Sequence, residues 1–539
     1  MIGSILASSA CTFNVIGFDK SKLKIPMMDF ASITYLPETR SKSKSNLLMS
    51  LTKDLTLSIE FKEISTVFIG TNLLLISSPI INNFRMWQYK SQVKKCLENG
   101  MKIGRKGNNM MKVALHNLGC KVNAYETEAM QELLEQNGYE IVPFKEGADI
   151  YVINTCTVTN MADRKSRQML HRAKKMNPDA IVVAAGCYVQ AKAESGEIDE
   201  CIDIVIGNNK KKELIEILEA YSKEKKERTQ AIIDINHTKE YEEMHLTKTA
   251  EHTRAYIKVQ DGCNQFCTYC IIPFARGRVR SRAKDDVIRE VKELAANGYQ
   301  EVVLTGIHLS SYGVDLENEN LLSLILAVNE VEGIKRIRLG SLEPRIITEE
   351  FAQTIAGLEK MCPHFHLSLQ SGCNATLKRM NRRYTAEEYF EKCELLRKYF
   401  ENPALTTDVI VGFPGETEEE FAESKAFVDK VNFYETHIFK YSKRAGTKAA
   451  VMENQVPENI KTERSNIMLE MDAEKRLQYE ENLVGETVEV LVEECVKING
   501  KEVQVGHSKE YVKIAIDSEI DLQNQLIDVQ IENRSQIIH

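Results

Sequence analysis

The stretch DGCNQFCTYC, residues 261–270, contains three cysteines, with three residues between the first two and two residues between the last two. A tetrahedral zinc site needs four ligands and usually takes them from two short pairs. Three thiolates on one short loop suit instead a cubane iron–sulfur cluster in which one iron has no protein ligand. Half of a zinc ribbon or a redox CxxC pair is the alternative, but no second CxxC follows at ribbon spacing. The stretch therefore predicts a reactive iron–sulfur site at Cys263, Cys267 and Cys270.

The sequence on either side of this loop predicts a partial barrel. Strand-like segments alternate with helical patterns, at 255–260, 301–305, 335–339, 364–369, 405–411 and 434–440. Such β/α units on a parallel sheet form a partial (β/α)6 barrel. The three-cysteine loop directly follows the first of these strands, at the carboxyl face where barrel enzymes carry their chemistry.

An open α/β domain is predicted before the barrel. Strands at 112–118, 150–154 and 180–185 are each followed, two residues past their end, by a cysteine: Cys120, Cys156 and Cys187. Because the carboxyl ends of parallel strands share one edge of a sheet, we expect these cysteines to converge as a second three-thiolate site. The alternative is that they are small buried hydrophobic residues, as free cysteine often is.

Residues 111–539 resemble the methylthiotransferases of the radical S-adenosylmethionine (SAM) superfamily. Eight motifs carry the resemblance: LGCKVNAYETE (118–128), NTCTVT (154–159), AAGCYVQ (184–190), DGCNQFCTYCIIPFARGRVRSR (261–282), LTGIHLSSYG (304–313), SLEP (341–344), LQSGCNATLKRMNRRY (369–384) and VGFPGETEEEF (411–421). Together these motifs are highly specific. Nothing in residues 1–110 belongs to the resemblance.

The resemblance implies SAM and two [4Fe-4S] clusters as cofactors. Cys263, Cys267 and Cys270 would hold the cluster that cleaves SAM reductively to a 5′-deoxyadenosyl radical. An auxiliary cluster that carries the sulfur to be inserted would be held by Cys120, Cys156 and Cys187.

Further residues are candidates for binding SAM or the substrate. Ser341 and Glu343 follow the third barrel strand and are expected to bind SAM, although a polar strand end is the alternative. The turn Gly412, Phe413 and Pro414 follows the fifth strand and would let the backbone approach the adenine, unless it is an ordinary turn. His308 and Gln370 lie at strand ends of the same mouth, as substrate contacts or as structural hydrogen-bonding groups.

A run of arginines suggests an RNA substrate. Arg276, Arg278, Arg280 and Arg282 occupy alternate positions behind the SAM motif, so an extended chain would present them on one face to RNA phosphates. Arg382 and Arg383 form a second basic group near the same mouth. A solvated loop is the alternative for the run.

The domain boundaries follow from these patterns. Residues 111–223 form the amino-terminal cluster domain, 224–248 a linker, 249–480 the radical SAM domain and 481–539 a small β-barrel that resembles the TRAM type of RNA-binding module. Residues 1–110 are an unassigned extension with 12 Lys and 3 Arg against 7 Asp and Glu. The codons of Lys106-Gly107 resemble a ribosome-binding site ahead of Met110, so the extension is expected to be untranslated; a disordered RNA-binding arm is the rival.

The substrate prediction depends on the first cluster motif. Cys120 is followed by Lys121-Val122-Asn123, which resembles the branch that modifies N6-threonylcarbamoyladenosine (t6A) in tRNA; the isopentenyladenosine branch more often reads GCQMN and the ribosomal-protein branch GCPKN. Methylthiolation of those two other substrates, or a non-catalytic zinc- or RNA-binding protein, are the alternatives. We expect a monomeric, cytoplasmic enzyme that binds tRNA and a flavodoxin- or ferredoxin-type electron donor and has no membrane segment.

Overall fold

The computed structural model describes residues 48–51, 57–61, 64–69, 72–77, 105–106 and 109–539, except 194–195, 197, 225–227, 250–252, 499 and 519. The chain divides into two compact units, 1–102 and 103–539. In the first unit, strands β1 (Leu48–Leu51), β2 (Leu57–Phe61), β3 (Ile64–Ile69) and β4 (Asn72–Ser77) form an antiparallel sheet. The predictions that residues 1–110 are untranslated, or form a disordered RNA-binding arm, concern a segment that lies mostly outside the described residues. The hairpin β5 (Arg105–Lys106) and β6 (Asn109–Met110) precedes the domain that follows.

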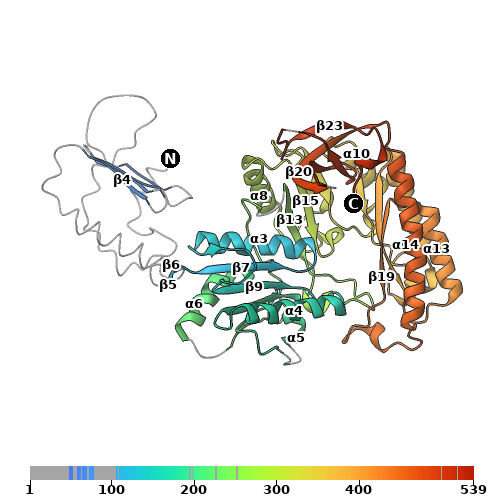
Figure 1. Ribbon diagram of the computed structural model, residues 1–539, viewed down its shortest axis with the longest axis horizontal. Helices are drawn as coiled ribbons and strands as arrows, with labels where there is room; N and C mark the ends of the chain where they lie inside the picture. Colours follow the sequence, from blue (N-terminus) through green and yellow to red (C-terminus); the bar gives the residue numbers. More distant parts are fainter. Residues whose placement is uncertain are drawn as a thin grey trace. The chain divides into compact units, whose positions relative to one another are not determined.

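The predicted open α/β domain is a six-stranded parallel sheet in the order β12-β11-β10-β9-β7-β8 (Figure 1). Its strands are β7 (Lys112–Asn117), β8 (Glu140–Ile141), β9 (Ile150–Thr155), β10 (Ile181–Gly186), β11 (Ile204–Ile206) and β12 (Thr229–Ala231). Its helices are α3 (Lys121–Gln136), α4 (Asn160–Met176), α5 (Cys187–Ala193) and α6 (Leu214–Glu224).

Both faces of this sheet are covered, as expected for parallel strands. Side chains of α3 and α6, such as Met130 and Leu218, pack on one face. Side chains of α4 and α5, such as Leu170 and Val189, pack on the other. Every residue of the central strand β9 is consequently buried.

The predicted linker 224–248 is partly wrong, because it contributes to the first domain. Strand β12 pairs in parallel with β11 and so extends the sheet. Further along, Met244 and Leu246 are buried in the same apolar cluster as α3 and α6. Polar composition suggested a linker, but the segment holds the two domains together.

The partial barrel is present as predicted. Its parallel strands are β13 (Arg254–Asp261), β15 (Glu301–Gly306), β16 (Arg336–Leu339), β17 (His364–His366), β18 (Ala404–Val411) and β19 (Glu435–Lys440), and single parallel bridges join β16 to the segments around β17. A short strand β14 (Arg280–Ser281) pairs antiparallel with β13. The helices of this domain are α7 (Ile272–Ala275), α8 (Lys284–Ala296), α9 (Leu321–Asn329), α10 (Glu349–Ala356), α11 (Asn374–Arg379), α12 (Ala386–Tyr399), α13 (Glu418–Val431) and α14 (Glu458–Glu481).

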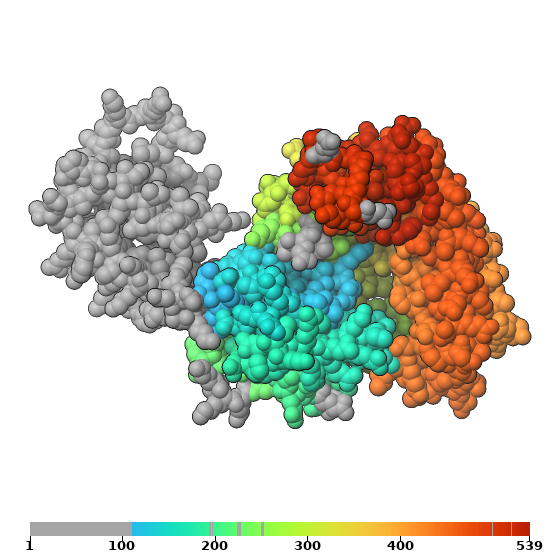
Figure 2. Space-filling view, viewed as in Figure 1, coloured from blue at the N-terminus to red at the C-terminus, as the bar shows by residue number. Residues whose placement is uncertain are grey.

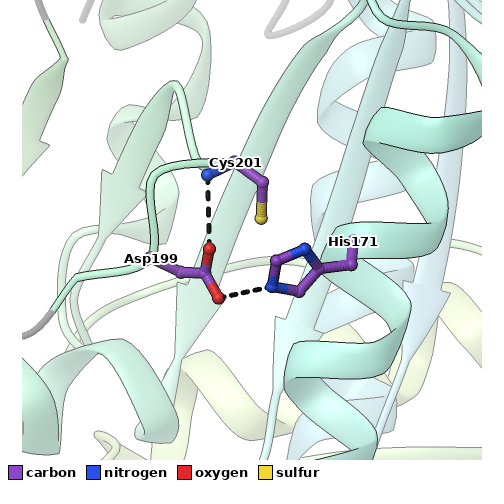
Figure 3. Close-up of side chains that lie close together, drawn as sticks. All are labelled: His171, Asp199 and Cys201. Atoms are coloured by element: carbon purple, nitrogen blue, oxygen red, sulfur yellow. Dashed lines mark hydrogen bonds and ion pairs between the residues drawn. The ribbon is translucent and has the colours of Figure 1, made fainter.

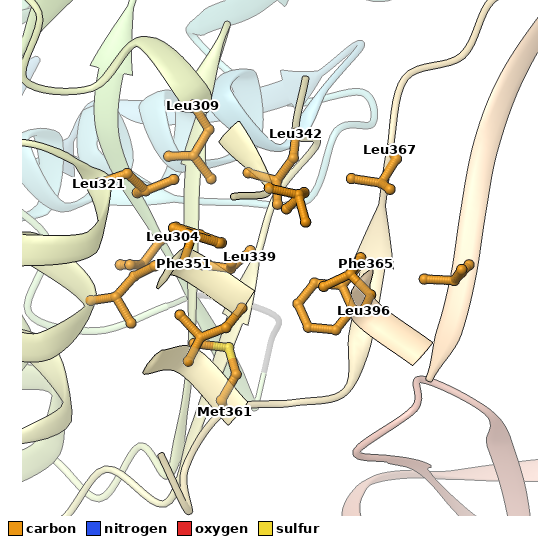
Figure 4. Close-up of a cluster of buried hydrophobic side chains, with 14 of the residues drawn as sticks. Leu304, Leu309, Leu321, Leu339, Leu342, Phe351, Met361, Phe365, Leu367 and Leu396 are labelled. Atoms are coloured by element: carbon orange, nitrogen blue, oxygen red, sulfur yellow. The ribbon is translucent and has the colours of Figure 1, made fainter. Parts of the chain in front are cut away.

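The barrel strands have one apolar and one polar face. Leu304, Leu339 and Phe365 belong to the apolar cluster that packs against the helices (Figure 4). The residues that alternate with them, such as Arg338 and His364, are polar, and successive residues of a strand point to opposite faces. The inner face of the partial barrel is therefore lined by charged and hydrogen-bonding groups.

The tail forms a four-stranded antiparallel sheet in the order β22-β21-β20-β23. Its strands are β20 (Thr487–Ile498), β21 (Lys501–Ser508), β22 (Lys513–Ile516) and β23 (Leu526–Gln530); β23 was not predicted, because its alternation is weak. Arg336 of the barrel donates hydrogen bonds to Glu489 Oε1 at 3.0 Å and to the His507 carbonyl at 2.9 Å. The tail sheet is thus docked on the barrel through buried arginines.

Among the helices of the described residues, none has the length and apolar character needed to cross a membrane.

Candidate active site

The loop of the first cysteine motif joins the end of β13 to α7. Cys263, Cys267 and Cys270 are all partly exposed on it. Gly262 before them has φ +71°, and a Cβ there would lie 1.8 Å from the carbonyl oxygen of Arg278. Only glycine fits this close approach of two backbone segments. The sharp turn at Gly262 therefore brings the three thiols to the carboxyl end of the barrel strand.

The three thiols of this loop interact electrostatically with one another. Burial, followed by smaller effects that include the charge of Cys267, raises the pKa of Cys263 to about 11. Burial and then the charge of Cys267 raise the pKa of Cys270 to about 12. Arg382 donates a hydrogen bond from one guanidinium nitrogen to Cys267 Sγ at 3.3 Å. This bond places a guanidinium group beside one of the three sulfur atoms.

The cysteines of the second set follow the carboxyl ends of β7, β9 and β10. Cys156 and Cys187 directly follow β9 and β10, one residue closer to the strands than expected, and both are buried; Cys120 is exposed at the start of α3. A Cβ on Gly119 would lie 2.9 Å from Cys156 Sγ, so the loop of Cys120 touches Cys156. Burial, and then the charge of Cys187, raise the pKa of Cys156 to about 11.

The spacing within both cysteine sets fits a cluster better than a single metal ion. Among the described residues, neither set brings its three sulfur atoms within 4.8 Å of one another, as the ligands of one ion would be. In a cubane, the three cysteines bind three different irons and are spread more widely. Six thiols in two sets of three are therefore the right donors for two iron–sulfur clusters, each with one iron left for another ligand.

Arg276 connects the two cysteine sets. It lies six residues after Cys270 in the sequence, and its Nε donates a hydrogen bond to Cys187 Sγ at 3.2 Å. Its terminal nitrogens donate to Glu126 at 2.8 and 3.0 Å and to Asn123 Oδ1 at 2.6 Å. The side chain is fully buried. One guanidinium thus ties the loop after the first motif to the cysteines of the amino-terminal domain.

A buried ion network surrounds Arg276. Lys258 Nζ lies 2.7 Å from Glu126 Oε1 and 2.7 Å from Asp261 Oδ2, and Lys211 Nζ lies 3.0 Å from Glu126 Oε2. Burial would raise the pKa of Glu126, but Arg276, Lys211 and Lys258 hold it well below its usual value. The network joins α3 to β13 and thereby fixes the first domain against the barrel.

The predicted phosphate-binding stripe of arginines is wrong for three of its four members. Arg276, Arg280 and Arg282 are 0, 1 and 2% exposed, so they cannot grip RNA at the surface. Arg282 instead forms an ion pair with Glu290, which is buried on α8. Glu126 and Glu290 are acidic residues on the buried faces of α3 and α8. An acidic residue on the apolar face of a helix is the sequence signal that could have predicted a buried cationic partner.

The remaining basic candidates differ in exposure. Arg278 is partly exposed, and its guanidinium carbon lies 4.5 Å from the centre of the Phe266 ring. Arg382 is partly buried and bonded to Cys267, whereas Arg383 is exposed. Arg278 and Arg383 are therefore the members of the set whose charges are open to an RNA backbone.

Glu343 lies close to the first cysteine set. It is buried, and its carboxylate accepts a hydrogen bond from Arg345 Nε at 2.8 Å. Its negative charge acts on both Cys263 and His308, which shows that these side chains are neighbours. Ser341, two residues earlier, is exposed. A carboxylate at this point suits the ammonium group of an amino acid moiety.

The turn that contains Gly412 packs against the cysteine loop. Phe413 is buried against Tyr269, the residue before Cys270, with ring centres 6.3 Å apart. Pro414 is also buried. The space that a Cβ of Gly412 would need is taken by Lys461 Cγ at 2.3 Å. The missing Cβ at Gly412 therefore leaves room for the aliphatic part of the Lys461 side chain, which comes from α14. This contact was not predicted from the sequence.

His308 has a free nitrogen near Glu343. Its Nδ1 is paired with Ser311 Oγ at 2.7 Å, while Nε2 is buried and has no hydrogen-bond partner among the described residues. Burial lowers the pKa of His308 to about 4, so the ring is neutral at pH 7. Gln370 differs, because its backbone N–H donates to the Asp408 carbonyl at 2.8 Å and joins the end of β17 to β18. Nε2 of His308 is therefore available to a ligand, and the backbone of Gln370 links two barrel strands.

The inner face of the barrel carries a further polar cluster that the sequence did not reveal. His366, Asp408 and His437 lie on β17, β18 and β19, with one ligand atom from each within 4.8 Å of the others. His366 Nε2 lies 3.3 Å from Asp408 Oδ2.

Figure 2 shows the surface hollowed between the first domain, in blue-green, and the carboxy-terminal half of the barrel, in orange.

Another cluster lies at the opposite edge of the first sheet. His171 of α4 contacts Asp199, which precedes β11 together with Cys201 (Figure 3). Burial and the hydrogen bond to Asp199 raise the pKa of Cys201 to about 12, so its sulfur is a protonated thiol at pH 7. This cluster is at the amino ends of the strands, whereas Cys120, Cys156 and Cys187 follow their carboxyl ends.

Residues 257–428 match the Radical SAM superfamily, and residues 112–207 match the Uncharacterized protein family UPF0004. The chain is 42% identical over 424 residues to the threonylcarbamoyladenosine tRNA methylthiotransferase MtaB of Bacillus subtilis (strain 168), covering 78% of this chain and 94% of the relative. Identity to the protein of the same name from Aquifex aeolicus (strain VF5) is 44% over 382 residues, covering 71% and 93%. The tRNA-2-methylthio-N(6)-dimethylallyladenosine synthase of Thermoanaerobacter pseudethanolicus is 39% identical over 397 residues, covering 72% and 83%.

Proposed function

Because this chain belongs to the radical SAM methylthiotransferase family, we propose that it converts t6A in tRNA to its 2-methylthio derivative. The proposal combines the chemistry of the site with the names of the most similar relatives.

The proposed type of reaction is supported above all by one observation, the presence of two separate three-thiol sets. Cys263, Cys267 and Cys270 would hold one [4Fe-4S] cluster, and Cys120, Cys156 and Cys187 would hold the other. When bound, the first cluster supplies reductive cleavage of SAM and the second supplies the sulfur that is inserted. Arg276 supports this division, because it keeps the two loops together by bonds to the protein on both sides.

The side chains around the first loop would bind and orient SAM. Glu343 has the charge to hold the SAM ammonium group, and the unpaired Nε2 of neutral His308 can exchange one hydrogen bond with the same ligand. Arg382 would hold the Cys267 sulfur in position through its hydrogen bond. The exposed Ser341 is proposed to contact SAM, and the buried turn Gly412, Phe413 and Pro414 is proposed to hold the cysteine loop in place for it.

The t6A substrate is favoured by two features of the sequence. Two MtaB proteins are 42 and 44% identical to the chain, whereas a dimethylallyladenosine enzyme is 39% identical. The first cluster motif also reads Cys120-Lys121-Val122-Asn123, which resembles the t6A branch. The partly exposed Arg278 and the exposed Arg383 are the cations proposed to contact the tRNA backbone. The tail sheet, residues 481–539, is proposed as an additional RNA-binding surface.

The same proposal includes a flavodoxin- or ferredoxin-type electron donor, a monomeric enzyme and the cytoplasm as the place of action.

Nucleoside analysis of tRNA from cells without this gene tests the function. We expect 2-methylthio-t6A to vanish and t6A to accumulate, and the wild-type gene should restore the product. Loss of the methylthio-isopentenyl derivative or of a modified ribosomal aspartate, with 2-methylthio-t6A unchanged, would move the chain to another branch. Anaerobically reconstituted enzyme acting on t6A-containing RNA gives the matching test in vitro.

A further inference from the structure

Three neighbouring strands of the barrel place polar side chains on one face. In the parallel register, His366 of β17 lies beside Thr406 of β18. Asp408, two residues further along β18, lies beside His437 of β19. Side chains at alternate positions of a strand share a face, and Phe365, on the opposite face, belongs to the apolar cluster that packs against the helices. The strand register therefore brings His366, Asp408 and His437 together on the inner face of the barrel.

The spacing of these three side chains suits a single metal ion. One ligand atom from each lies within 4.8 Å of the others, and His366 Nε2 is 3.3 Å from Asp408 Oδ2. Two atoms that bind the same ion at about 2.1 Å are up to about 4.2 Å apart. A small movement of the side chains is therefore enough for all three to bind one ion.

His366 is already oriented for this role. Its Nδ1 lies 2.9 Å from Thr406 Oγ1, so Nε2 is the nitrogen that faces Asp408. Metal-binding histidines almost always use their second ring nitrogen for a hydrogen bond of this kind, which fixes the orientation of the ring. The His366 side chain is 12% exposed and that of His437 is 45% exposed, so the cluster is open to solvent on the side of His437.

The charges around the cluster favour a cation. In the part of the chain that the structure describes, Asp408 forms an ion pair with His366 and with no lysine or arginine. Glu435 lies on the same face of β19, two residues before His437, and its carboxylate is 3.8 Å from His437 Nδ1. Glu435 likewise pairs with no lysine or arginine of the described residues. Two carboxylates thus lie beside two imidazole rings without a permanent positive charge, which a divalent cation would supply.

The cluster is separate from both cysteine sets but close to the first. Ser368, two residues after His366, accepts a hydrogen bond through its carbonyl from Arg382 at 3.2 Å. Another nitrogen of Arg382 donates to Cys267 Sγ at 3.3 Å. The cluster therefore lies deeper in the barrel than the loop of Cys267, and none of its members is a ligand of the iron–sulfur cluster proposed there.

Two imidazoles and one carboxylate form a known ligand set for a single divalent metal ion that keeps open coordination positions. We propose that His366, Asp408 and His437 bind one divalent first-row metal ion such as Fe²⁺ or Mn²⁺, in addition to the two iron–sulfur clusters. Water would fill the open positions of the ion in the free enzyme. The inference depends on these three side chains and not on the identity of the RNA substrate.

The test uses Mn²⁺ as the probe, because it prefers oxygen and nitrogen ligands to thiolates and so leaves the cysteine sites to iron. Full-length, anaerobically reconstituted enzyme without a histidine tag is titrated with Mn²⁺ while its iron–sulfur clusters are oxidised and give no signal. Electron paramagnetic resonance of free Mn²⁺ gives the stoichiometry and the dissociation constant. Pulsed electron paramagnetic resonance of the bound ion detects nitrogen ligands directly and needs no variant.

The variants separate the ligands from their supporting residue and from a second candidate cluster. His437→Gln and Asp408→Asn each remove one proposed ligand. Thr406→Val removes the partner of His366, and Thr406→Ser keeps the hydroxyl group. The matched control is His171→Gln, which removes an exposed imidazole from the other compact group of possible ligands, at the opposite edge of the first sheet.

Wild-type enzyme should bind one Mn²⁺ per chain, with nitrogen couplings in the pulsed spectrum. Thr406→Val should weaken binding by about tenfold, the usual effect of losing the partner of a metal-binding histidine, and Thr406→Ser should bind as wild type does. His437→Gln and Asp408→Asn should weaken it by more than tenfold, and His437→Gln should also reduce the nitrogen couplings. His171→Gln should bind as wild type does. Iron content and the midpoint of thermal unfolding without Mn²⁺ verify that each variant is folded.

Three results would overturn the inference. The first is wild-type enzyme that binds no Mn²⁺ saturably, or binds it without nitrogen couplings. The second is unchanged binding in folded His437→Gln and Asp408→Asn. The third is loss of binding in His171→Gln alone, which would place the ion at the exposed cluster of the first domain instead of inside the barrel.

Discussion

Arg276 Nε donates a hydrogen bond of 3.2 Å to Cys187 Sγ, and this bond joins the loop of the first cysteine motif to the second cysteine set. The same guanidinium is paired with Glu126 and Asp261, so its position is fixed from both domains. A bond from a cation to a metal-binding sulfur stabilises the thiolate and lowers the electron density that the sulfur donates. Arg276 is thus a positioning residue for the auxiliary cluster.

Arg276→Met should destabilise the protein and change the auxiliary cluster. Removal of one partner of a buried ion network costs about 3 kcal/mol, because the carboxylates of Glu126 and Asp261 lose a counter-charge. The midpoint of thermal unfolding and the electron paramagnetic resonance spectrum of the reduced auxiliary cluster are the measurements. Arg276→Lys should unfold less easily than Arg276→Met but keep an altered spectrum, since one ammonium cannot reach all the partners.

Arg278→Lys is the matched control for this prediction. Arg278 lies on the same loop but is partly exposed over the Phe266 ring. We expect less than 1 kcal/mol of destabilisation, about the value of an exposed cation–π contact, and an unchanged spectrum. If both variants behaved alike, the role given to Arg276 would be wrong.

The two cysteine sets should separate in function. Alanine at Cys263, Cys267 or Cys270 should abolish formation of 5′-deoxyadenosine. Alanine at Cys120, Cys156 or Cys187 should preserve it and remove the methylthiolated product. Chromatography of small-molecule products and mass spectrometry of the RNA measure the two outcomes in one reaction.

Cys495→Ser, at an exposed cysteine outside both sets, should leave both products unchanged. Continued methylthiolation over many turnovers by a variant at Cys156 would contradict the assignment of the auxiliary set.

Much of this architecture could be predicted because it depends on local patterns. The alternation of strand and helix patterns predicted the barrel and the first sheet, since short apolar strand segments are visible without knowledge of distant contacts. The cysteine spacing predicted the two thiol sets. Strand β9, for example, is an apolar run followed directly by Cys156, as a buried parallel strand should be.

The charged residues could not be predicted in the same way. Arginines on alternate positions look like a surface stripe until their partners are known. The partner of Arg276 is Glu126 of α3, 150 residues away in sequence. The partner of Arg282 is Glu290 of α8, eight residues on, and burial of this pair depends on how α8 packs. Segment 224–248 was likewise mistaken for a linker because polar residues conceal the contribution of β12 to the sheet. Long-range ion pairs are set by the tertiary fold, and no local period reveals them.

Glu343→Gln should weaken SAM binding by about tenfold, because a charge-assisted hydrogen bond to an ammonium group becomes a neutral one. Equilibrium binding of SAM to reconstituted enzyme measures the change, and Glu359→Gln, at an exposed carboxylate, is the control. A dissociation constant that shifts by less than twofold in Glu343→Gln would show that Glu343 serves Arg345 and His308 rather than SAM.

Glu301 should make the docking of the tail sheet dependent on pH. Burial alone would raise the pKa of Glu301, but the positive charges of Arg338, Arg254 and Arg336 bring it below the usual value. A carboxyl group with a lower pKa in the folded than in the unfolded chain contributes its full stability above the unfolded-state pKa. That contribution is lost as the pH falls through the folded-state pKa.

Glu301→Gln should therefore destabilise the protein by about 3–5 kcal/mol at pH 7, because Arg336 and Arg338 lose their buried counter-charge. The difference from wild type should shrink as the pH falls below the usual glutamate pKa, since the carboxyl group is protonated first in the unfolded chain and only at lower pH in the folded chain. Urea unfolding at a series of pH values, followed by far-ultraviolet circular dichroism, measures this difference.

The exposed Glu332→Gln serves as the control and should show little change at any pH. A constant difference between Glu301→Gln and wild type down to acid pH would mean that shape, and not charge, accounts for the role of Glu301. In that case the arginines that dock the tail sheet would be held by their bonds to the carbonyl groups of His507 and Ser508.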